Sequence, residues 1–164
     1  MLAMEKSFSF YFPAFSGTYA LFLTLAAPAE LTIGRLGTFA FPVGQYIYTG
    51  SARGPGGVRA RLRHHLRPAQ RPHWHIDYLR KRAVVTGGVY LVQQEVPAGN
   101  VPLECAWSQA LLALPGASVP AVGFGASDCT SRCGAHLVHF SQFIDVSGRL
   151  RNNSGNEVIH WTAP

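Results

Sequence analysis

The chain has 164 residues, of which 48% are hydrophobic and only 13% are charged. This length fits about one domain and this composition supports a buried core, which excludes a disordered chain. No run approaches the roughly 18 apolar residues of a membrane-spanning helix, and residues 1–15 lack the basic leader and cleavage site of a signal peptide. Three cysteines do not favour a disulfide scaffold, so we expect a cytoplasmic protein without a membrane partner.

The positive charge is concentrated in the middle of the chain. The formal net charge is +6. Residues 53–82 contain nine basic residues and one acidic residue, Asp77, whereas the remainder of the chain is mildly acidic. A basic block on an acidic body indicates an anionic partner, and arginine side chains match the geometry of phosphate. We therefore expect a nucleic-acid partner.

The first part of the chain alternates strand patterns with turn residues. Runs rich in aromatic and β-branched residues predict strands, and Gly and Pro mark the connections. The expected elements are an N-terminal arm (1–16) with a strand-like run (8–12), a strand (17–25), a turn (26–30), a hairpin (31–33 and 38–41) and a strand (45–49). A loop rich in Gly and Pro follows at 50–57.

The second part mixes helices with strands. Val58, Leu62 and Leu66 form an apolar stripe that predicts a helix over 58–66, and arginines form a second stripe on it. Further expected elements are a helix (74–82), a strand interrupted by Gly87-Gly88 (83–93), an amphipathic helix (103–114), a last strand (135–143) and a loosely packed polar tail (145–164). The order predicts an α/β (α+β) fold, with a small central sheet of short strands flanked by helices.

The loop at 50–57 lies between a strand and a helix. Free amides at a helix N-terminus favour phosphate, but the glycine spacing matches neither a Walker loop nor a dinucleotide fingerprint. The alternative is a loop whose glycines only supply left-handed backbone. Both interpretations stay open from the sequence.

Two groups of residues suggest zinc without matching a standard zinc pattern. The order of His73, His75 and Asp77 is similar to that of metallo-β-lactamase-type nucleases, but Tyr78 stands where a further His is needed. We expect instead that Trp74 and Ile76 pack inward and that the two histidines contact phosphate. The second group is Cys129, Cys133 and His136, joined by Cys105 or His139. Its irregular spacing favours buried free thiols over structural zinc.

Glu104 is a candidate metal ligand because it lies in the first turn of the strongest predicted helix, beside its apolar seam. A single carboxylate leaves most of a Mg²⁺ coordination shell to water and substrate phosphate, which is how that ion usually binds. The alternative is a surface Glu that only stabilises the helix dipole.

These features together resemble the GIY-YIG endonucleases, and the wider pattern looks like their stand-alone Uri-type branch. Residues 17–19 (Gly-Thr-Tyr) and 48–50 (Tyr-Thr-Gly) resemble the two motifs that name the family, and Arg61 and His65 follow in its Arg-x-x-x-His order. The resemblance extends through the segments 73–79, 104–105, 124–129 and 136–137. It implies a nuclease domain over 17–142 with an inserted hairpin near 30–42, and a tail at 143–164 packed on or trailing from it.

The resemblance implies a metal-dependent DNA endonuclease that hydrolyses phosphodiester bonds. One Mg²⁺ or Mn²⁺ would bind Glu104, Tyr19 would orient or deprotonate the attacking water, and Arg61 would neutralise charge on the phosphate. Tyr48 would hydrogen-bond in the same pocket, and His65 would relay a proton or hold phosphate. Asp128 is the candidate for the family's downstream Asn.

The basic segment supplies the expected DNA contacts. The residues are Arg53, Arg59, Arg63, Arg67, His73 and His75. A non-catalytic nucleic-acid-binding module using the basic 53–82 face is the alternative function, and a zinc-stabilised interaction domain is a further one. The first alternative predicts salt-sensitive binding without cleavage.

Overall fold

We describe the fold from a computed structural model, which covers residues 11–68, 70–93, 100–154 and 157–164. Its elements in chain order are β1 (Gly17–Leu25), β2 (Ala29–Ile33), β3 (Gly37–Phe41), β4 (Gly44–Ala52), α1 (Gly57–Leu66), α2 (His75–Leu79), β5 (Val84–Val92), α3 (Leu103–Leu112), β6 (Leu137–Phe140), α4 (Ser147–Ser154) and β7 (Ile159–Thr162). The strand-like run expected at 8–12 lies mostly outside the described residues, and residues 11 and 12 belong to no strand.

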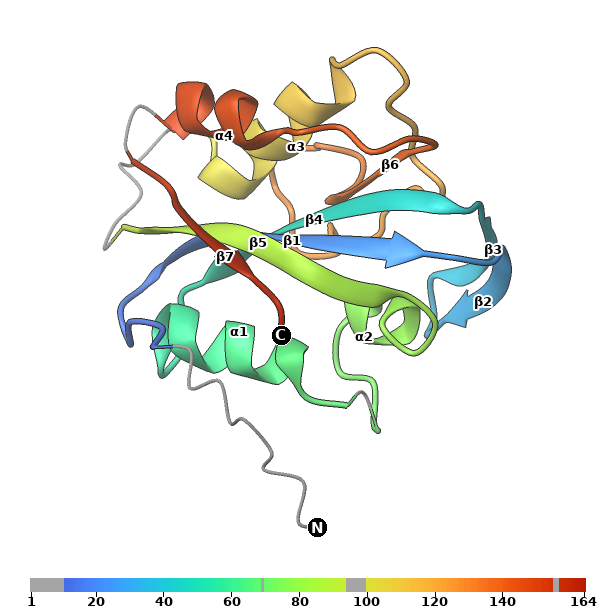
Figure 1. The fold of residues 1–164 in the computed structure, drawn as a ribbon, viewed down its shortest axis with the longest axis horizontal. Coiled ribbons are helices and arrows are strands. Elements are labelled where there is room, and N and C mark those ends of the chain that lie inside the picture. Colours follow the sequence, from blue (N-terminus) through green and yellow to red (C-terminus); the bar gives the residue numbers. More distant parts are fainter. Residues whose placement is uncertain (1–10, 69, 94–99, 155–156) are drawn as a thin grey trace, which may run out of the picture.

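Five strands form one antiparallel sheet in the order β6-β4-β1-β5-β7 (Figure 1). The central strand β1 pairs along its whole length with β4, which places Tyr19 opposite Gly50 and Leu21 opposite Tyr48. On its other side β1 pairs with β5, where the register shifts beside Gly87. This irregularity coincides with the glycine pair that interrupts the strand pattern in the sequence.

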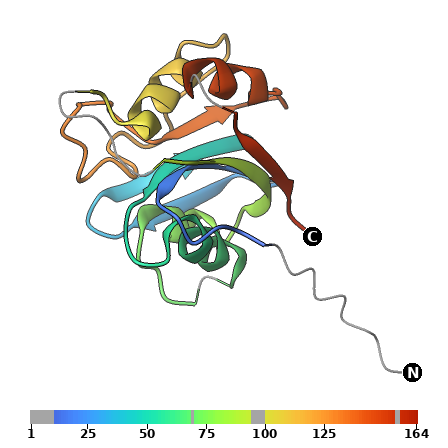
Figure 2. The ribbon, with the colours of Figure 1, turned by 90° about the vertical axis from the view of Figure 1, so that its left-hand side faces the viewer.

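Helices cover both faces of the sheet, which gives three layers (Figures 1 and 2). Alternate side chains of β1 enter different cores: Tyr19 and Leu21 pack with Leu62 of α1, whereas Ala20 packs with Trp107 of α3. Because both faces are buried, β1 reads as an almost continuous apolar run rather than as a half-polar strand. The predicted α/β fold, with a small central sheet between helices, is confirmed.

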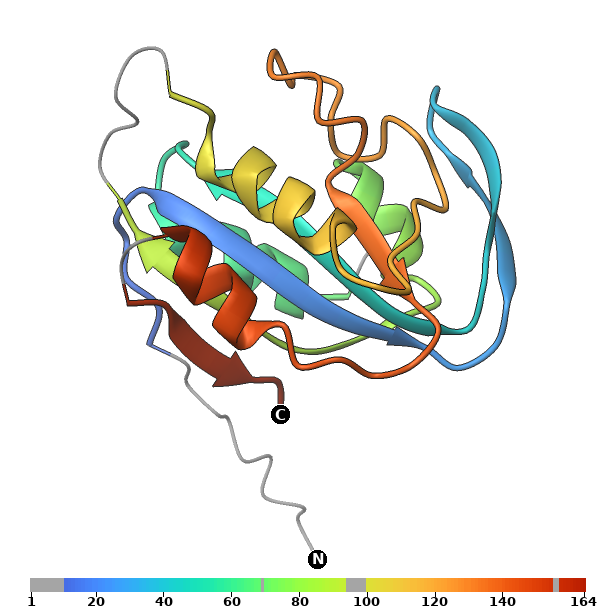
Figure 3. The same ribbon diagram turned by 90° about the horizontal axis from the view of Figure 1, so that it is seen from above.

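The inserted hairpin expected near 30–42 is confirmed as β2 and β3, which form their own two-stranded sheet. It lies at one end of the main sheet, seen clearly from above (Figure 3). Its turn uses positive φ at Gly34 and Gly37, a conformation that glycine adopts without steric cost.

Three elements differ from the sequence predictions by three residues at one end. Helix α2 ends at Leu79 rather than at 82, because the chain turns through Arg80–Ala83 with hydrogen bonds back to Ile76 and Leu79. Strand β4 continues to Ala52, so the first residues of the predicted 50–57 loop pair with β1. Strand β6 spans only residues 137–140 of the predicted 135–143.

The prediction of a loosely packed tail is wrong. Helix α4 packs against α3, and β7 adds the last strand of the sheet by pairing with β5. Val146, Leu150 and Val158 are buried in the core on the α3 side, and Trp161 is buried in the core on the α1 side. These widely spaced apolar residues carry the packing, although the average composition of the segment is polar. No helix in the described part of the chain is long and apolar enough to cross a membrane.

Candidate active site

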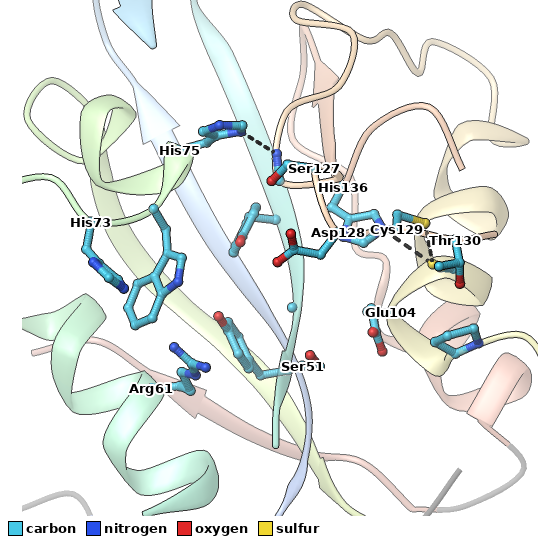
Figure 4. Close-up of a pocket in the computed structure, with 17 residues that line it drawn as sticks. Ser51, Arg61, His73, His75, Glu104, Ser127, Asp128, Cys129, Thr130 and His136 are labelled. Carbon is cyan, nitrogen blue, oxygen red and sulfur yellow. Dashed lines mark hydrogen bonds between the residues drawn. The ribbon is translucent and has the colours of Figure 1, made fainter. Parts of the chain in front are cut away.

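A pocket of about 330 Å³ lies at the edge of β4, beyond the end of β6. Strand β6 pairs only with residues 45–48 of β4, so the later residues of β4 line the pocket. Tyr19, Tyr48, Arg61 and Glu104 all line it, although they come from four different elements. Figure 4 shows Arg61 and His73 on one side of β4 and Glu104 on the other.

The two tyrosines are placed by the antiparallel register of β1 and β4. Their side chains lie on the same face of the sheet, and their ring centroids are 6.3 Å apart. The Tyr19 ring crosses directly over Gly50, where a Cβ would lie only 2.6 Å from the phenol oxygen. The glycine that follows Tyr48-Thr49 is therefore required for space, because a larger residue would push the Tyr19 ring aside.

His65 lies behind Tyr19 and does not line the pocket. The Tyr19 hydroxyl and His65 Nε2 are 2.8 Å apart and form a hydrogen bond. His65 is 1% exposed, and this burial lowers its pKa to about 3, so the ring is neutral at physiological pH. Among the described residues its Nδ1 has no hydrogen-bond partner. The structure thus places His65 against Tyr19, outside the residues that line the pocket.

Both phenols are protonated at neutral pH. Burial raises the pKa of Tyr19 well above its usual value, and the neighbouring Tyr48 raises it further, although the positive charge of Arg61 opposes the shift. Burial likewise raises the pKa of Tyr48. These side chains therefore offer hydroxyl groups, not phenolates, to the pocket.

Arg61 is held at the pocket by an aromatic ring. Its guanidinium carbon lies 4.3 Å from the centroid of the Trp74 ring, a cation–π arrangement. Both residues line the pocket and both are half-buried. The sequence prediction of an inward-packed Trp74 missed this stacking role, because residue spacing in separate elements does not show which side chains meet.

Glu104 presents an unsatisfied oxygen. It lies in the first turn of α3, which is fixed to β4 by a hydrogen bond from the Thr49 hydroxyl to the Glu104 carbonyl oxygen. Its Oε2 is buried, and none of the described residues donates a hydrogen bond to it. A buried carboxylate oxygen without a donor is costly unless a cation or another ligand satisfies it. The residue thus fits a role as a metal ligand at this pocket.

The predicted DNA-contacting residues divide into two groups. His73 and His75 line the pocket, and His75 Nδ1 accepts a hydrogen bond from the Gly125 amide. The four arginines Arg53, Arg59, Arg63 and Arg67 lie outside it. Arg53 donates to the carbonyl of Gln93 and Arg59 to that of Phe12. Arg63 and Arg67 are exposed on the outer face and at the end of α1.

Asp77 does not join His73 and His75 in a metal site. Its Oδ2 accepts hydrogen bonds from the backbone amides of His73 and Trp74, which caps α2. Its carboxylate also pairs with His64 and with Arg80. Burial opposes ionisation of Asp77, but these hydrogen bonds outweigh it and lower its pKa. The carboxylate is thus used to join α1 to α2.

The structure shows that Cys105, and not His139, joins Cys129, Cys133 and His136. Cys105, Cys129, Cys133 and His136 gather at one side of the pocket, and we call them the Cys/His cluster. His139 lies elsewhere, where its ring nitrogens contact the Ser118 hydroxyl and the Val43 carbonyl. Cys105 lies 24, 28 and 31 positions before Cys129, Cys133 and His136 in the sequence, so local spacing alone does not pair it with them.

The pocket also contains polar residues to which the sequence assigns no defined role, apart from Asp128. Ser51, Ser127 and Thr130 contribute hydroxyl groups, and Asp128 contributes an exposed carboxylate. The only sequence signal for Asp128 is its position downstream in the chain, where the resembling family has an Asn. Ser127 lies in the resembling segment 124–129, but serine and threonine are common in any loop, so the hydroxyl residues carry no specific signal.

The chain belongs to the family described as a domain of unknown function, DUF123, whose model matches residues 18–156. This match covers every pocket residue discussed above. No curated protein matches the chain, and no solved structure matches it.

Proposed function

We propose that the protein is a metal-dependent DNA endonuclease with a GIY-YIG-type site, similar to the Uri-type branch. The supporting observation is the meeting of Tyr19, Tyr48, Arg61 and Glu104, which are far apart in the sequence, at one pocket. Two hydroxyls, a guanidinium and a carboxylate oxygen without a hydrogen-bond donor are the kinds of group that metal-assisted hydrolysis needs at one cavity.

Glu104 would hold one Mg²⁺ or Mn²⁺. These ions bind carboxylate oxygen, which the unpartnered Oε2 of Glu104 would supply. The remaining coordination positions would go to water and to substrate phosphate. When bound, such an ion polarises the phosphate and stabilises the leaving oxygen.

Tyr19 would position the attacking water rather than remove its proton. Its raised pKa makes it a poor base at neutral pH. When its hydroxyl donates to His65 Nε2, the phenol oxygen keeps lone pairs that accept a hydrogen bond from water. His65, held neutral by burial, fixes the direction of that hydroxyl.

Arg61 would bind the phosphate whose charge increases during the reaction. A guanidinium donates hydrogen bonds in a rigid fork, and stacking on Trp74 fixes its plane beside the two tyrosines. A preorganised cation of this kind stabilises the transition state without reorganisation. Exposed arginines on α1, including Arg63, would contact flanking phosphates.

The test is cleavage of end-labelled single-stranded, duplex and branched DNA with Mg²⁺ or Mn²⁺. The wild type is compared with Glu104→Gln and with Glu30→Gln, a matched control on the exposed surface of β2. Glu104→Gln keeps the size of the side chain but removes its charge, so cleavage is expected to disappear while Glu30→Gln cuts like the wild type. Equal cleavage by both variants would place the activity at another site.

The same assay separates the nuclease from a binding module. DNA binding that weakens steeply with salt, with no cleavage by the wild type under either metal, would support the non-catalytic alternative. Thermal unfolding of each variant verifies that loss of cleavage does not reflect loss of the fold.

A further inference from the structure

The Cys/His cluster brings four strong metal-binding atoms together. The Sγ atoms of Cys129 and Cys133 are 2.6 Å apart, those of Cys105 and Cys133 are 2.8 Å apart, and those of Cys105 and Cys129 are 3.3 Å apart. The Nε2 atom of His136 lies 3.0 Å from the sulfur of Cys133 and 3.4 Å from that of Cys105. Three thiols and an imidazole are the donor set of a common structural zinc site.

The arrangement is compact enough for one tetrahedral ion. Zinc–sulfur bonds of about 2.3 Å place two tetrahedral sulfur ligands about 3.8 Å apart. The observed separations are somewhat shorter, so small outward movements of the side chains would admit an ion between them. Cys105, Cys133 and His136 are buried and Cys129 is half-buried, so most of the cluster is withdrawn from the surface at one side of the pocket.

The cluster links the first turn of α3 to the irregular segment that precedes β6. Cys105 lies in the first turn of α3, and His136 immediately precedes β6. Between these elements, residues 113–136 form no helix or strand. Arg132 and Gly134 have positive φ on either side of Cys133, which turns the chain around that sulfur. A long irregular segment in a compact domain needs such fixed points.

We propose that the Cys/His cluster binds one Zn²⁺ as a structural site. All four ligands come from the protein, which is typical of structural rather than catalytic zinc. Thiolate ligands select zinc over the hard ions that a carboxylate such as Glu104 prefers, so the two sites would hold different metals. The irregular Cys-x-x-x-Cys-x-x-His spacing is accommodated because the remaining ligand, Cys105, comes from a helix.

The zinc site would also fix the position of Glu104. Cys105 follows Glu104 directly, so a metal bond to its sulfur would hold the first turn of α3 against the 129–136 segment. This consequence rests on the proposed function, whereas zinc binding itself does not. Metal content can therefore be tested without DNA, and its failure would leave the nuclease proposal standing.

The experiment measures metal in protein purified under reducing conditions with zinc in the medium. Elemental analysis is expected to find about one zinc ion per chain. Cobalt substitution of the wild type is expected to give the intense visible bands of a tetrahedral thiolate-rich site. A chelator that removes zinc should expose three reactive thiols and lower the midpoint of thermal unfolding.

Variants then assign the ligands. Cys129→Ser and His136→Gln are expected to lose most of the zinc, whereas Ser131→Ala, a control within the same loop, should retain it. A folded wild-type chain with three free thiols and no bound zinc or cobalt would overturn the proposal. So would a Cys129–Cys133 disulfide in place of metal, or zinc content that neither ligand variant changes. The cobalt spectrum of the wild type decides the matter if the variants do not fold.

Discussion

The two sides of the pocket are built in different ways. Tyr19 and Tyr48 project from paired strands at the centre of the sheet, and Arg61 and His65 from a helix packed on it. Glu104 and the Cys/His cluster lie on the first turn of α3 and on an irregular segment. The first side is fixed by the strand register and the core, whereas on the second side α3 packs in a core but the 113–136 segment has no strand register. The proposed zinc ion would hold the irregular segment against α3, and so would fix the second side of the pocket as firmly as the strand register fixes the first.

The largest expected effect on the rigid side concerns Arg61. Replacing Arg61 by Ala is expected to lower the cleavage rate by about 10²–10³-fold, because it removes a preorganised cation from the phosphate site. Arg35→Ala, in the exposed hairpin turn, removes the same charge away from the pocket and serves as control. Single-turnover cleavage at saturating DNA measures both. Equal rates for the two variants would show that Arg61 acts only through the net charge.

The second effect concerns the neutral His65 beneath Tyr19. Its pKa is about 3 in the folded state and about 6.5 when unfolded, so the unfolded chain binds more protons between these values. This contribution to stability is present above pH 6.5 and is lost as the pH falls toward 3. Acidification from pH 7.5 to pH 4.5 is therefore expected to lower the free energy of unfolding by about 2–3 kcal/mol through this group.

Asp77, His75 and His136 also have lowered pKa values and shift stability in the same direction. Denaturant unfolding of the wild type and of His65→Asn at pH 7.5 and pH 4.5 isolates the share of His65. The variant is expected to lose less stability on acidification than the wild type does. An identical pH dependence in both proteins would mean that His65 is not held neutral by burial.

The third effect tests the close approach of β1 and β4. Gly50→Ala is expected to destabilise the protein by about 1–3 kcal/mol, since its Cβ would lie 2.6 Å from the Tyr19 ring. Gly148→Ala is the matched control, because Gly148 lies in α4 and, apart from its chain neighbours and its own helix backbone, no atom of the described residues lies within 4 Å of the added Cβ. There the change should be neutral or stabilising by a few tenths of a kcal/mol. Unfolding by urea measures both variants.

The smallest effect concerns the exposed arginines. Arg63→Gln is expected to reduce the slope of log K against log salt by about one, if it contacts one phosphate of a DNA duplex. The half-buried Arg59 differs, because its guanidinium donates to the Phe12 carbonyl and lies over the Tyr11 ring. Arg59→Gln is therefore expected to lower thermal stability in addition to reducing the salt slope. Binding of labelled DNA over a range of salt concentrations provides the slopes. An unchanged slope for Arg63→Gln would place the DNA on another face.

The rigid side of the site could be predicted from the sequence better than the irregular side. The strand over 17–25 and the helix over 58–66 follow from short-range patterns, and pairing β1 with β4 then brings Tyr19 and Tyr48 together. The sequence did not decide whether Cys105 or His139 lies beside Cys129, because an irregular segment has no periodicity that predicts its path. The closing strand β7 was missed because only Trp161 among its residues is buried.

The most direct test of the account is a crystal structure of the protein with Mn²⁺, recorded at a wavelength where manganese scatters anomalously. The account predicts an anomalous peak in the pocket, beside Oε2 of Glu104 and facing Tyr19 and Arg61, which disappears in Glu104→Gln. A pocket without manganese, or a peak that persists in the variant, would contradict it.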